Sequence, residues 1–549
     1  MENKDPILEH SNLPENGKRN LNLVKKDRVG KTDVSLRDKR DNILRRKRNK
    51  ARSLSGEFRR AIITSVDDVA KLVQGCSNPN RGVADQAMFY LRRHLCSKRK
   101  LYLDKLLELN IVDVLVSRLV TGETDDIKYN ALWALAYITS CGCQDTSFFL
   151  RESVISALSS LLCGNNLSLI EQSLLALSNI IAEGPVPREF VLRSNILSTL
   201  NQILNQHRSS ISVTKNISWI LRNICRSKYG DVPIEYIEPI LQILDVLIGH
   251  NTENVLSDVL WSISYLADSS SDHVSLLIES GIVDKIYMFL GATKKLTVNT
   301  LRVIGNISAT EDKNIQHLFD NGVFFHLRKY LNTPNKRLRK KVYWILSNFA
   351  AGTRSQILTL YSLNIFPQIL EDLEEGEFGI RREAFWIISN IVHNSTIKEV
   401  QPFLRSNMLC MMRKYLENRD YDMIVAALKV VVALLRLYSA HNNKEYMCQK
   451  VCQSGVLDCI KNLQTNTDDS IRFWAIHILE NYFPEECEQD VEDKDHEQDV
   501  EDRDHEQDAE NKDHEQDVED KDPEQDAGDE EILYNGQSDL SNELNQCGF

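Results

Sequence analysis

The hydrophobic pattern of the chain is helical between about residues 66 and 482. Stretches such as NISWILRNIC (216–225) and KVYWILSNFA (341–350) carry apolar residues at the spacing of one helical face. Alternation of the kind expected for strands is scarce, and glycine-containing breaks separate these stretches from further helical segments. The pattern therefore predicts an all-α protein.

The tryptophans reveal an internal repeat. Five of the six recur with gaps of 86, 42, 83 and 42 residues, at Trp133, Trp219, Trp261, Trp344 and Trp386. Halving the two long gaps predicts further copies near positions 176 and 302, where the chain reads LLALSNI around Leu175 and LRVIGNI around Arg302. An all-helical period of about 42 residues is typical of armadillo or HEAT repeats, in which each unit buries its apolar face against its neighbours. We expect a right-handed superhelical armadillo-repeat solenoid of about ten repeats, between roughly Val66 and Tyr482.

A polar residue follows each marker after one helical turn. Four residues beyond the seven markers stand Tyr137, Asn179, Asn223, Tyr265, Asn306, Asn348 and Asn390. The spacing places each pair on one helix face. A carboxamide can both donate to and accept from the backbone of an extended peptide, and neighbouring indoles can hold the stems and charges of lysine and arginine. The array thus predicts a surface for extended cationic peptides. The alternative is that the tryptophans belong to the core and the asparagines cap or bridge repeats.

Charge is segregated at the two ends. Hydrophobic residues make up 42% of the chain and charged residues 26%, which is normal for a folded protein. Residues 1–52 contain 16 Lys/Arg against 8 Asp/Glu, whereas residues 485–531 contain 26 acidic against 4 basic residues. The sequence predicts a basic segment (1–56), a repeat domain (57–484) and an acidic low-complexity tail (485–549), with disordered ends.

Four stretches carry a family resemblance. They are NTLRVIGN (299–306), with arginine at the marker position, WSISYLAD (261–268), ISWILRNICRSK (217–228) and ILENYFPEE (478–486). On these residues the chain resembles the importin-α family of nuclear import adaptors. The resemblance implies binding of lysine- and arginine-rich nuclear localisation signals in a concave groove, partnership with importin-β, recycling by an export receptor, and shuttling between cytoplasm and nucleus.

The resemblance also implies two peptide sites. The minor site matches at Arg302, Asn306, Asp312, Trp344, Asn348, Glu383, Trp386 and Asn390. The major site matches at Trp133, Thr146, Asn179, Glu183, Trp219, Asn223, Trp261, Tyr265 and Asp268. It departs from the family at Tyr137, where the family has asparagine, and at Leu175, where it has tryptophan. The major site thus lacks one asparagine that could bind the peptide backbone and one tryptophan that could stack on its side chains, which should cost about 1 to 3 kcal/mol of binding free energy in total. We therefore expect cargo to favour the minor site or bipartite signals.

The basic segment GKTDVSLRDKRDNILRRKRNKARS (30–53) resembles an importin-β-binding segment. Its cluster Arg45, Arg46, Lys47 and Arg48 has the chemistry of the cargo, so we expect it to occupy the groove and inhibit binding. The alternative is a nucleic-acid-binding arm. No aromatic residue precedes Phe58, so base stacking is not supported and no direct nucleic-acid partner is predicted.

Catalytic and metal chemistry find little support in the sequence. The tail repeats DHEQDVEDK with His496, His505 and His514 nine residues apart, which indicates a disordered acidic tail rather than a metal site. Cys141 and Cys143 do not have the spacing of a zinc or redox motif, so we expect no enzyme and no cofactor. The apolar stretch 424–437 is too short for a membrane span. The remaining alternative function is an armadillo scaffold without a transport role.

Overall fold

The computed structural model describes residues 66–97, 103–122, 124–140, 147–226, 230–418 and 420–484. In these ranges the regular elements are helices, and no strand occurs. The expected segments 1–56 and 485–549, with the basic cluster Arg45 to Arg48, lie outside the described residues. The chain divides into two compact units, one up to Val303 and one from Ile304, and the boundary falls within α16 (Lys294–Ser308).

In its described residues the first unit is built from groups of two or three helices, of which the last is the longest. We call this last helix the third helix of its repeat. The third helices are α3 (Arg81–Ser97), α6 (Asp125–Thr139), α8 (Leu167–Ile181), α11 (Ile211–Cys225) and α13 (Glu253–Leu266). The shorter helices are α2 (Val66–Cys76), α4 (Leu103–Glu108), α5 (Ile111–Thr121), α7 (Glu152–Leu162), α9 (Pro185–Leu192), α10 (Ile196–Gln206), η2 (Ile234–Tyr236), α12 (Ile237–Leu247), α14 (Ser271–Glu279), α15 (Ile282–Lys285) and η3 (Ile286–Phe289).

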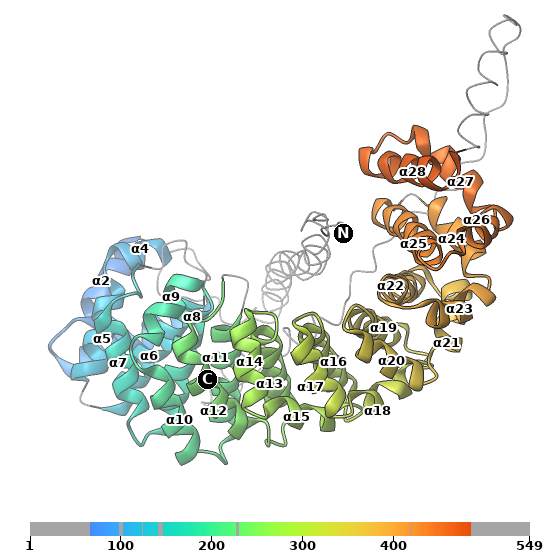
Figure 1. The fold of residues 1–549 in the computed structure, drawn as a ribbon. Coiled ribbons are helices and arrows are strands. Elements are labelled where there is room, and N and C mark those ends of the chain that lie inside the picture. The colour runs from blue at the N-terminus through green and yellow to red at the C-terminus, as the bar shows by residue number, and fades with distance from the viewer. Residues whose placement is uncertain are drawn as a thin grey trace, which may run out of the picture. The chain divides into compact units, whose positions relative to one another are not determined.

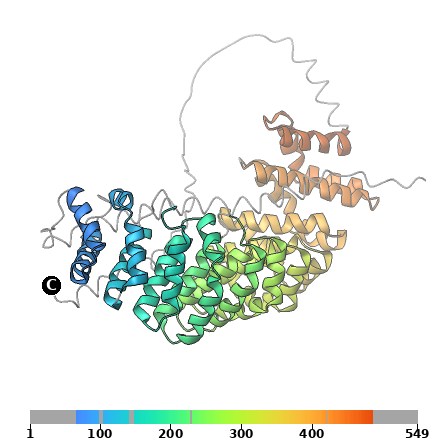
Figure 2. The ribbon, with the colours of Figure 1, turned by 90° about the vertical axis from the view of Figure 1, so that its left-hand side faces the viewer.

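Successive third helices of the first unit pack against one another. The contacts run from α3 to α6, from α6 to α8, from α8 to α11 and from α11 to α13. Figures 1 and 2 show these helices as successive layers in chain order. Their buried faces are aliphatic, as at Leu132, Leu135 and Leu174, so each layer removes apolar surface from water only by contact with its neighbours.

The second unit repeats this arrangement. Its third helices are α19 (Lys336–Ala350), α22 (Phe378–Asn394), α25 (Tyr421–Ser439) and α28 (Asp469–Tyr482), each packed against the next. Its shorter helices are α17 (Asp312–Asp320), α18 (Val323–Leu327), η4 (Arg328–Tyr330), α20 (Arg354–Ser362), α21 (Phe366–Glu375), α23 (Ile397–Arg405), α24 (Met408–Leu416), α26 (Lys444–Gln453), α27 (Val456–Asn462) and η5 (Leu463–Thr465). Larger side chains, among them Tyr343, Phe385 and Tyr438, fill its core.

A left-handed residue marks the turn between the first and second helices of most repeats. These residues have φ between 52° and 73° and are Asn110, Asn195, Gly281, Gly322, Asn364, Asn407 and Gly455. Glycine adopts this conformation without steric penalty and asparagine tolerates it better than other side chains, which explains the restriction to these two types. Glycine-containing breaks were predicted from the sequence, but this second periodic series of asparagine and glycine was not.

Short polar side chains cap the starts of several third helices. Asn166, Ser210 and Asn335 accept backbone N–H bonds at the starts of α8, α11 and α19. Such caps satisfy backbone donors that the helix itself leaves unpaired. Among the described helices, none is long and apolar enough to cross a membrane.

Candidate peptide-binding surface

The marker tryptophans of the first unit lie on its third helices but differ in exposure. Trp133 on α6 and Trp261 on α13 are only 4% and 8% exposed, whereas Trp219 on α11 is half-buried. Leu175 occupies the corresponding position of α8 and is also half-buried. The first unit therefore offers a less open row of indoles than the sequence pattern alone indicated.

The asparagines bridge neighbouring repeats. In the first unit Nδ2 of Asn179 donates to the carbonyl oxygen of Ala136 at 3.0 Å, and Nδ2 of Asn223 donates to Oγ of Ser178 at 3.0 Å. Each bond reaches back one repeat, from one third helix to the preceding one. The bridging role considered in the sequence analysis is thus present in the structure.

The same bridge recurs in the second unit. Nδ2 of Asn348 donates to Oγ of Ser308 at 3.0 Å, and Nδ2 of Asn390 donates to the carbonyl oxygen of Ser347 at 2.8 Å. Because the bridges use the amino group, the carboxamide oxygens are left without a donor among the described residues. Bridging and ligand binding are therefore compatible: one end of the amide fixes its orientation and the other end can accept a hydrogen bond.

The indole of Trp133 is covered by side chains of this chain. Tyr137 stacks on it, with ring centroids 5.5 Å apart and planes inclined by 13°. The guanidinium of Arg92, on the preceding third helix, lies 5.3 Å from the centroid of the Trp133 ring and 5.3 Å from that of Tyr129. The indole Nε1 is buried and donates to no acceptor among the described residues. Where the family has an asparagine that could bind a peptide backbone, this chain has the ring of Tyr137, which covers Trp133.

Trp261 is likewise held by arginines of this chain. The guanidinium carbon of Arg302 lies 3.6 Å from the indole centroid, and that of Arg222 lies 5.0 Å from it. Tyr265 packs one turn along α13, with its ring 5.4 Å from the indole. A guanidinium attracted to an indole face is the interaction expected of a bound peptide, and here the protein supplies it itself.

Arg222 also joins the Trp261 cluster to a buried ion pair. Its Nη1 donates to Oδ1 of Asp258 at 3.1 Å, and both side chains are almost fully buried. Burial raises the pKa of Asp258, and the positive charge of Arg222 opposes that rise. The pair holds the Arg222 guanidinium beside Trp261, so this part of the array is a structural cluster.

The second unit carries a more open part of the array. Trp344 on α19 and Trp386 on α22 are half-buried, and Asn306, at the end of α16, is buried. A Cβ atom at Gly305 would overlap the Trp344 indole, so only glycine lets the indole lie against α16. The minor-site tryptophans are thus placed by backbone packing and keep an accessible face.

The acidic residues expected at the two sites lie on or next to the helices that carry the array. Glu183 and Asp268 are half-buried just after α8 and α13, Asp312 is exposed at the start of α17, and Glu383 is buried on α22, one turn before Trp386. Thr146 lies outside the described residues. The second unit therefore combines accessible indoles with a carboxylate on the same helix.

Two further residues continue the register and were missed as members of the array. Lys429 on α25 lies 43 residues after Trp386, and Trp474 on α28 lies 45 residues after Lys429. The ammonium Nζ of Lys429 is 5.7 Å from the centroid of the Trp474 indole. Trp474, the sixth tryptophan, lies about two repeat lengths after Trp386, and this spacing could have identified both residues from the sequence.

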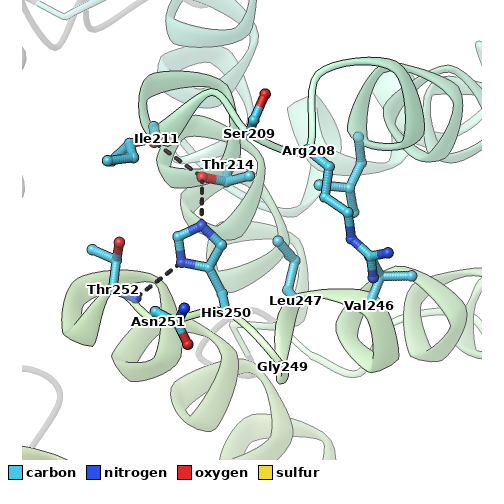
Figure 3. A pocket seen from close by; sticks show the side chains of 11 residues that line it. Arg208, Ser209, Ile211, Thr214, Val246, Leu247, Gly249, His250, Asn251 and Thr252 are labelled. Atoms are coloured by element: carbon cyan, nitrogen blue, oxygen red, sulfur yellow. Dashed lines mark hydrogen bonds between the residues drawn. The ribbon is translucent and has the colours of Figure 1, made fainter.

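A separate pocket of about 390 Å³ lies at the beginnings of α11 and α13 (Figure 3). Its polar groups satisfy one another: Nε2 of His250 lies 3.4 Å from Oγ1 of Thr214, and Nδ1 accepts the backbone N–H of Thr252 at 3.0 Å. Burial lowers the pKa of His250. The array lies in the later halves of the same helices, so this pocket is not part of it. In the described ranges, no group of His, Cys, Asp or Glu is arranged to hold a metal ion.

The fold and the array define an all-α armadillo-repeat protein with a regular series of indoles and carboxamides on its third helices. A family model described as an atypical Arm repeat matches residues 445–498. The importin subunit alpha-3 of Arabidopsis thaliana is 30% identical over 438 residues, which cover 78% of this chain and 82% of that protein. The importin subunit alpha-1b of Oryza sativa subsp. japonica is 26% identical over 286 residues, which cover 52% of this chain and 53% of that protein.

The fold is also that of a solved structure. The crystal structure of an engineered protein matches with a TM-score of 0.65 at 19% identity, covering 76% of this chain and 98% of that one. This likeness concerns the fold alone. The similarity in sequence goes further: the chain belongs to the importin-α family, a family of nuclear import adaptors. The expected fold class and family are thereby confirmed.

Proposed function

We propose that this protein binds lysine- and arginine-rich nuclear localisation signals and links their carriers to importin-β. The observation that carries the proposal is the amide orientation in the second unit. There the asparagine amino groups are tied to the preceding repeat, while their carboxamide oxygens have no donor among the described residues. Fixed acceptors along a helix face suit the backbone of an extended peptide.

Selectivity for cations would come from the indoles and the nearby carboxylates. A lysine or arginine against a half-exposed indole such as Trp386 gains about 0.5 to 2 kcal/mol. Glu383 and Asp312 are proposed acidic contacts for the same peptide. The minor site proposed here comprises, in the second unit, Asn306, Asp312, Trp344, Asn348, Glu383, Trp386 and Asn390. Arg302, which the resemblance also assigned to this site, covers Trp261 of the first unit.

The first unit is proposed as the weaker of the two sites. Two of its tryptophans, Trp133 and Trp261, already hold arginines of this chain, and Leu175 provides no indole. A peptide cation there would have to displace a guanidinium or use Trp219 alone. Asn179, Asn223, Glu183 and Asp268 remain as proposed backbone and charge contacts, with Thr146 from outside the described residues.

The transport cycle forms the rest of the proposal. The cluster Arg45 to Arg48 would occupy the cargo surface until importin-β removes the basic segment, and an export receptor would return the empty adaptor. On this proposal the protein shuttles between cytoplasm and nucleus and has no enzymatic role. The alternative, an armadillo scaffold without transport, predicts that the indole array does not distinguish basic peptides from others.

Isothermal titration of the full chain with a lysine- and arginine-rich peptide tests the proposal. Trp386→Ala should weaken binding roughly 2- to 30-fold, the equivalent of 0.5 to 2 kcal/mol. Phe325→Ala removes a similarly large side chain that is 85% exposed on α18 and should leave the affinity unchanged. A chain lacking residues 1–56 should bind more tightly than the full chain. Equal affinity for the basic peptide and for an acidic peptide would favour the scaffold alternative.

A further inference from the structure

The array does not end at Trp386. Lys429 and Trp474 continue its register on α25 and α28, and α25 packs against both α22 and α28. His393 lies seven residues after Trp386 on α22, and Arg436 lies seven residues after Lys429 on α25, so each pair shares a helix face. We refer to Trp386, His393, Lys429, Arg436 and Trp474 as the C-terminal cation face.

Lys429 and Arg436 make no salt bridge within the described part of the chain. The carboxylate of Asp422 acts electrostatically on Lys429, and Arg382 also contacts that carboxylate, at 3.9 Å. Lys429 thus lies half-buried beside the Trp474 indole, and Arg436 is exposed two helical turns further along α25.

The electrostatics of the neighbouring groups agree with this placement. Loss of hydration lowers the pKa of Lys429, and Asp422 opposes the shift without cancelling it. Desolvation also lowers the pKa of His393, and the positive charges of Lys429 and Arg436 add to that effect. The hydrogen bond between Nδ1 of His393 and the carbonyl oxygen of Ser389 opposes the lowering of this pKa.

A segment of matching charge follows in the same chain. Residues 485–531 carry 26 acidic and 4 basic residues, and they begin three residues after α28 ends at Tyr482. Packed helices are about 8 to 10 Å apart, so α22 is about 20 Å from α28. Twenty residues of polypeptide can span up to about 70 Å, so the acidic segment is long enough to reach every residue of the C-terminal cation face.

We propose that the acidic segment 485–531 docks on the C-terminal cation face and supplies counter-charge to it. The observation that carries this is the position of Lys429 and Arg436, which form no salt bridge with any described residue and continue the register of the indoles of Trp386 and Trp474. Tethering raises the effective concentration of the segment to about the millimolar range, so weak single contacts suffice. The proposal does not rest on the function proposed above, since it concerns an acidic ligand and a different part of the array.

Docking of the tail would limit the cargo surface. Glu383 precedes Trp386 on α22, whereas the cations lie beyond it, so the sign of the surface changes along the array. A basic peptide would be attracted as far as Trp386 and repelled beyond it. The acidic segment would occupy the surface beyond Trp386 and would not compete with a basic peptide for the carboxylates.

Zero-length carbodiimide cross-linking of the full chain tests the inference. The reagent joins a lysine amine to a carboxylate with loss of water, and mass spectrometry identifies the joined peptides. Lys429 should be joined to residues 485–531 at low salt, and the yield should fall as salt screens the attraction. Arg436→Glu should lower the yield at Lys429 about five-fold, since it replaces an attraction by a repulsion.

Arg405→Glu serves as the matched control. Arg405 is also exposed, ends α23 and makes no ion pair among the described residues, but it lies outside the C-terminal cation face. Its substitution should leave the Lys429 links unchanged. Mixing isotopically light and heavy chains distinguishes the tail of the same chain, which gives unmixed links, from that of a second copy. Three results would overturn the proposal. They are cross-links between light and heavy chains, cross-links of the tail carboxylates mainly to lysines of residues 1–52, and an equal loss of Lys429 cross-links in both variants.

Discussion

Restoring the missing indole of the first unit tests how the array works. Leu175 lies on α8, which packs between α6 and α11, and it occupies the register position between Trp133 and Trp219. Leu175→Trp would place an indole there on a side chain that is already half-exposed. Asn179 would keep its bond to the carbonyl of Ala136, so the neighbouring clamp should stay oriented.

The gain can be bounded from the structure. A cation on one accessible indole face contributes about 0.5 to 2 kcal/mol, which is roughly a 2- to 30-fold gain in affinity. The neighbouring indole of Trp133 would not increase this gain in affinity, because Tyr137 and Arg92 already cover it. We therefore expect an increase within this range, with little change in the melting temperature.

Titration calorimetry with a single-cluster basic peptide measures this gain. The chain should lack residues 1–56, so that its own basic cluster does not compete, and should carry Trp386→Ala to weaken the second unit. Leu358→Trp on α20 is the control, because Leu358 is 46% exposed on an outer helix. If Leu175→Trp binds no more tightly than Leu358→Trp, the indoles do not form cation slots and the reasoning is wrong.

Two further substitutions test the packing that positions the array. Gly305→Ala should displace the Trp344 indole and weaken binding of a basic peptide to the second unit several-fold, which calorimetry would detect; unchanged affinity would show that Trp344 does not contact the peptide. Asp258→Ala should lower the free energy of unfolding by about 3 to 5 kcal/mol, because it leaves the Arg222 charge buried without its partner. Denaturant unfolding measures that loss, and replacing both members of the pair by apolar residues should recover most of it.

The pairing of tryptophan and asparagine shows both the strength and the limit of sequence reasoning. The interval of about 42 residues and the spacing of four residues along a helix placed Trp344, Asn348, Trp386 and Asn390 on successive third helices, where the structure has them. The same pattern could not show that the asparagine amino groups reach back to the preceding repeat. Those acceptors lie about 40 residues away, so only packing identifies them.

The class of fold, the family and the helix face of each marker residue can be read from the sequence, because helical periodicity and repeat length are properties of neighbouring residues. Which indoles stay accessible depends on how the repeats pack. Trp133 and Trp261 are covered by Arg92, Arg222 and Arg302, which approach from neighbouring repeats. Long flexible arginines reach an indole only where two helices pack at the right distance, and no local pattern in the sequence specifies that distance.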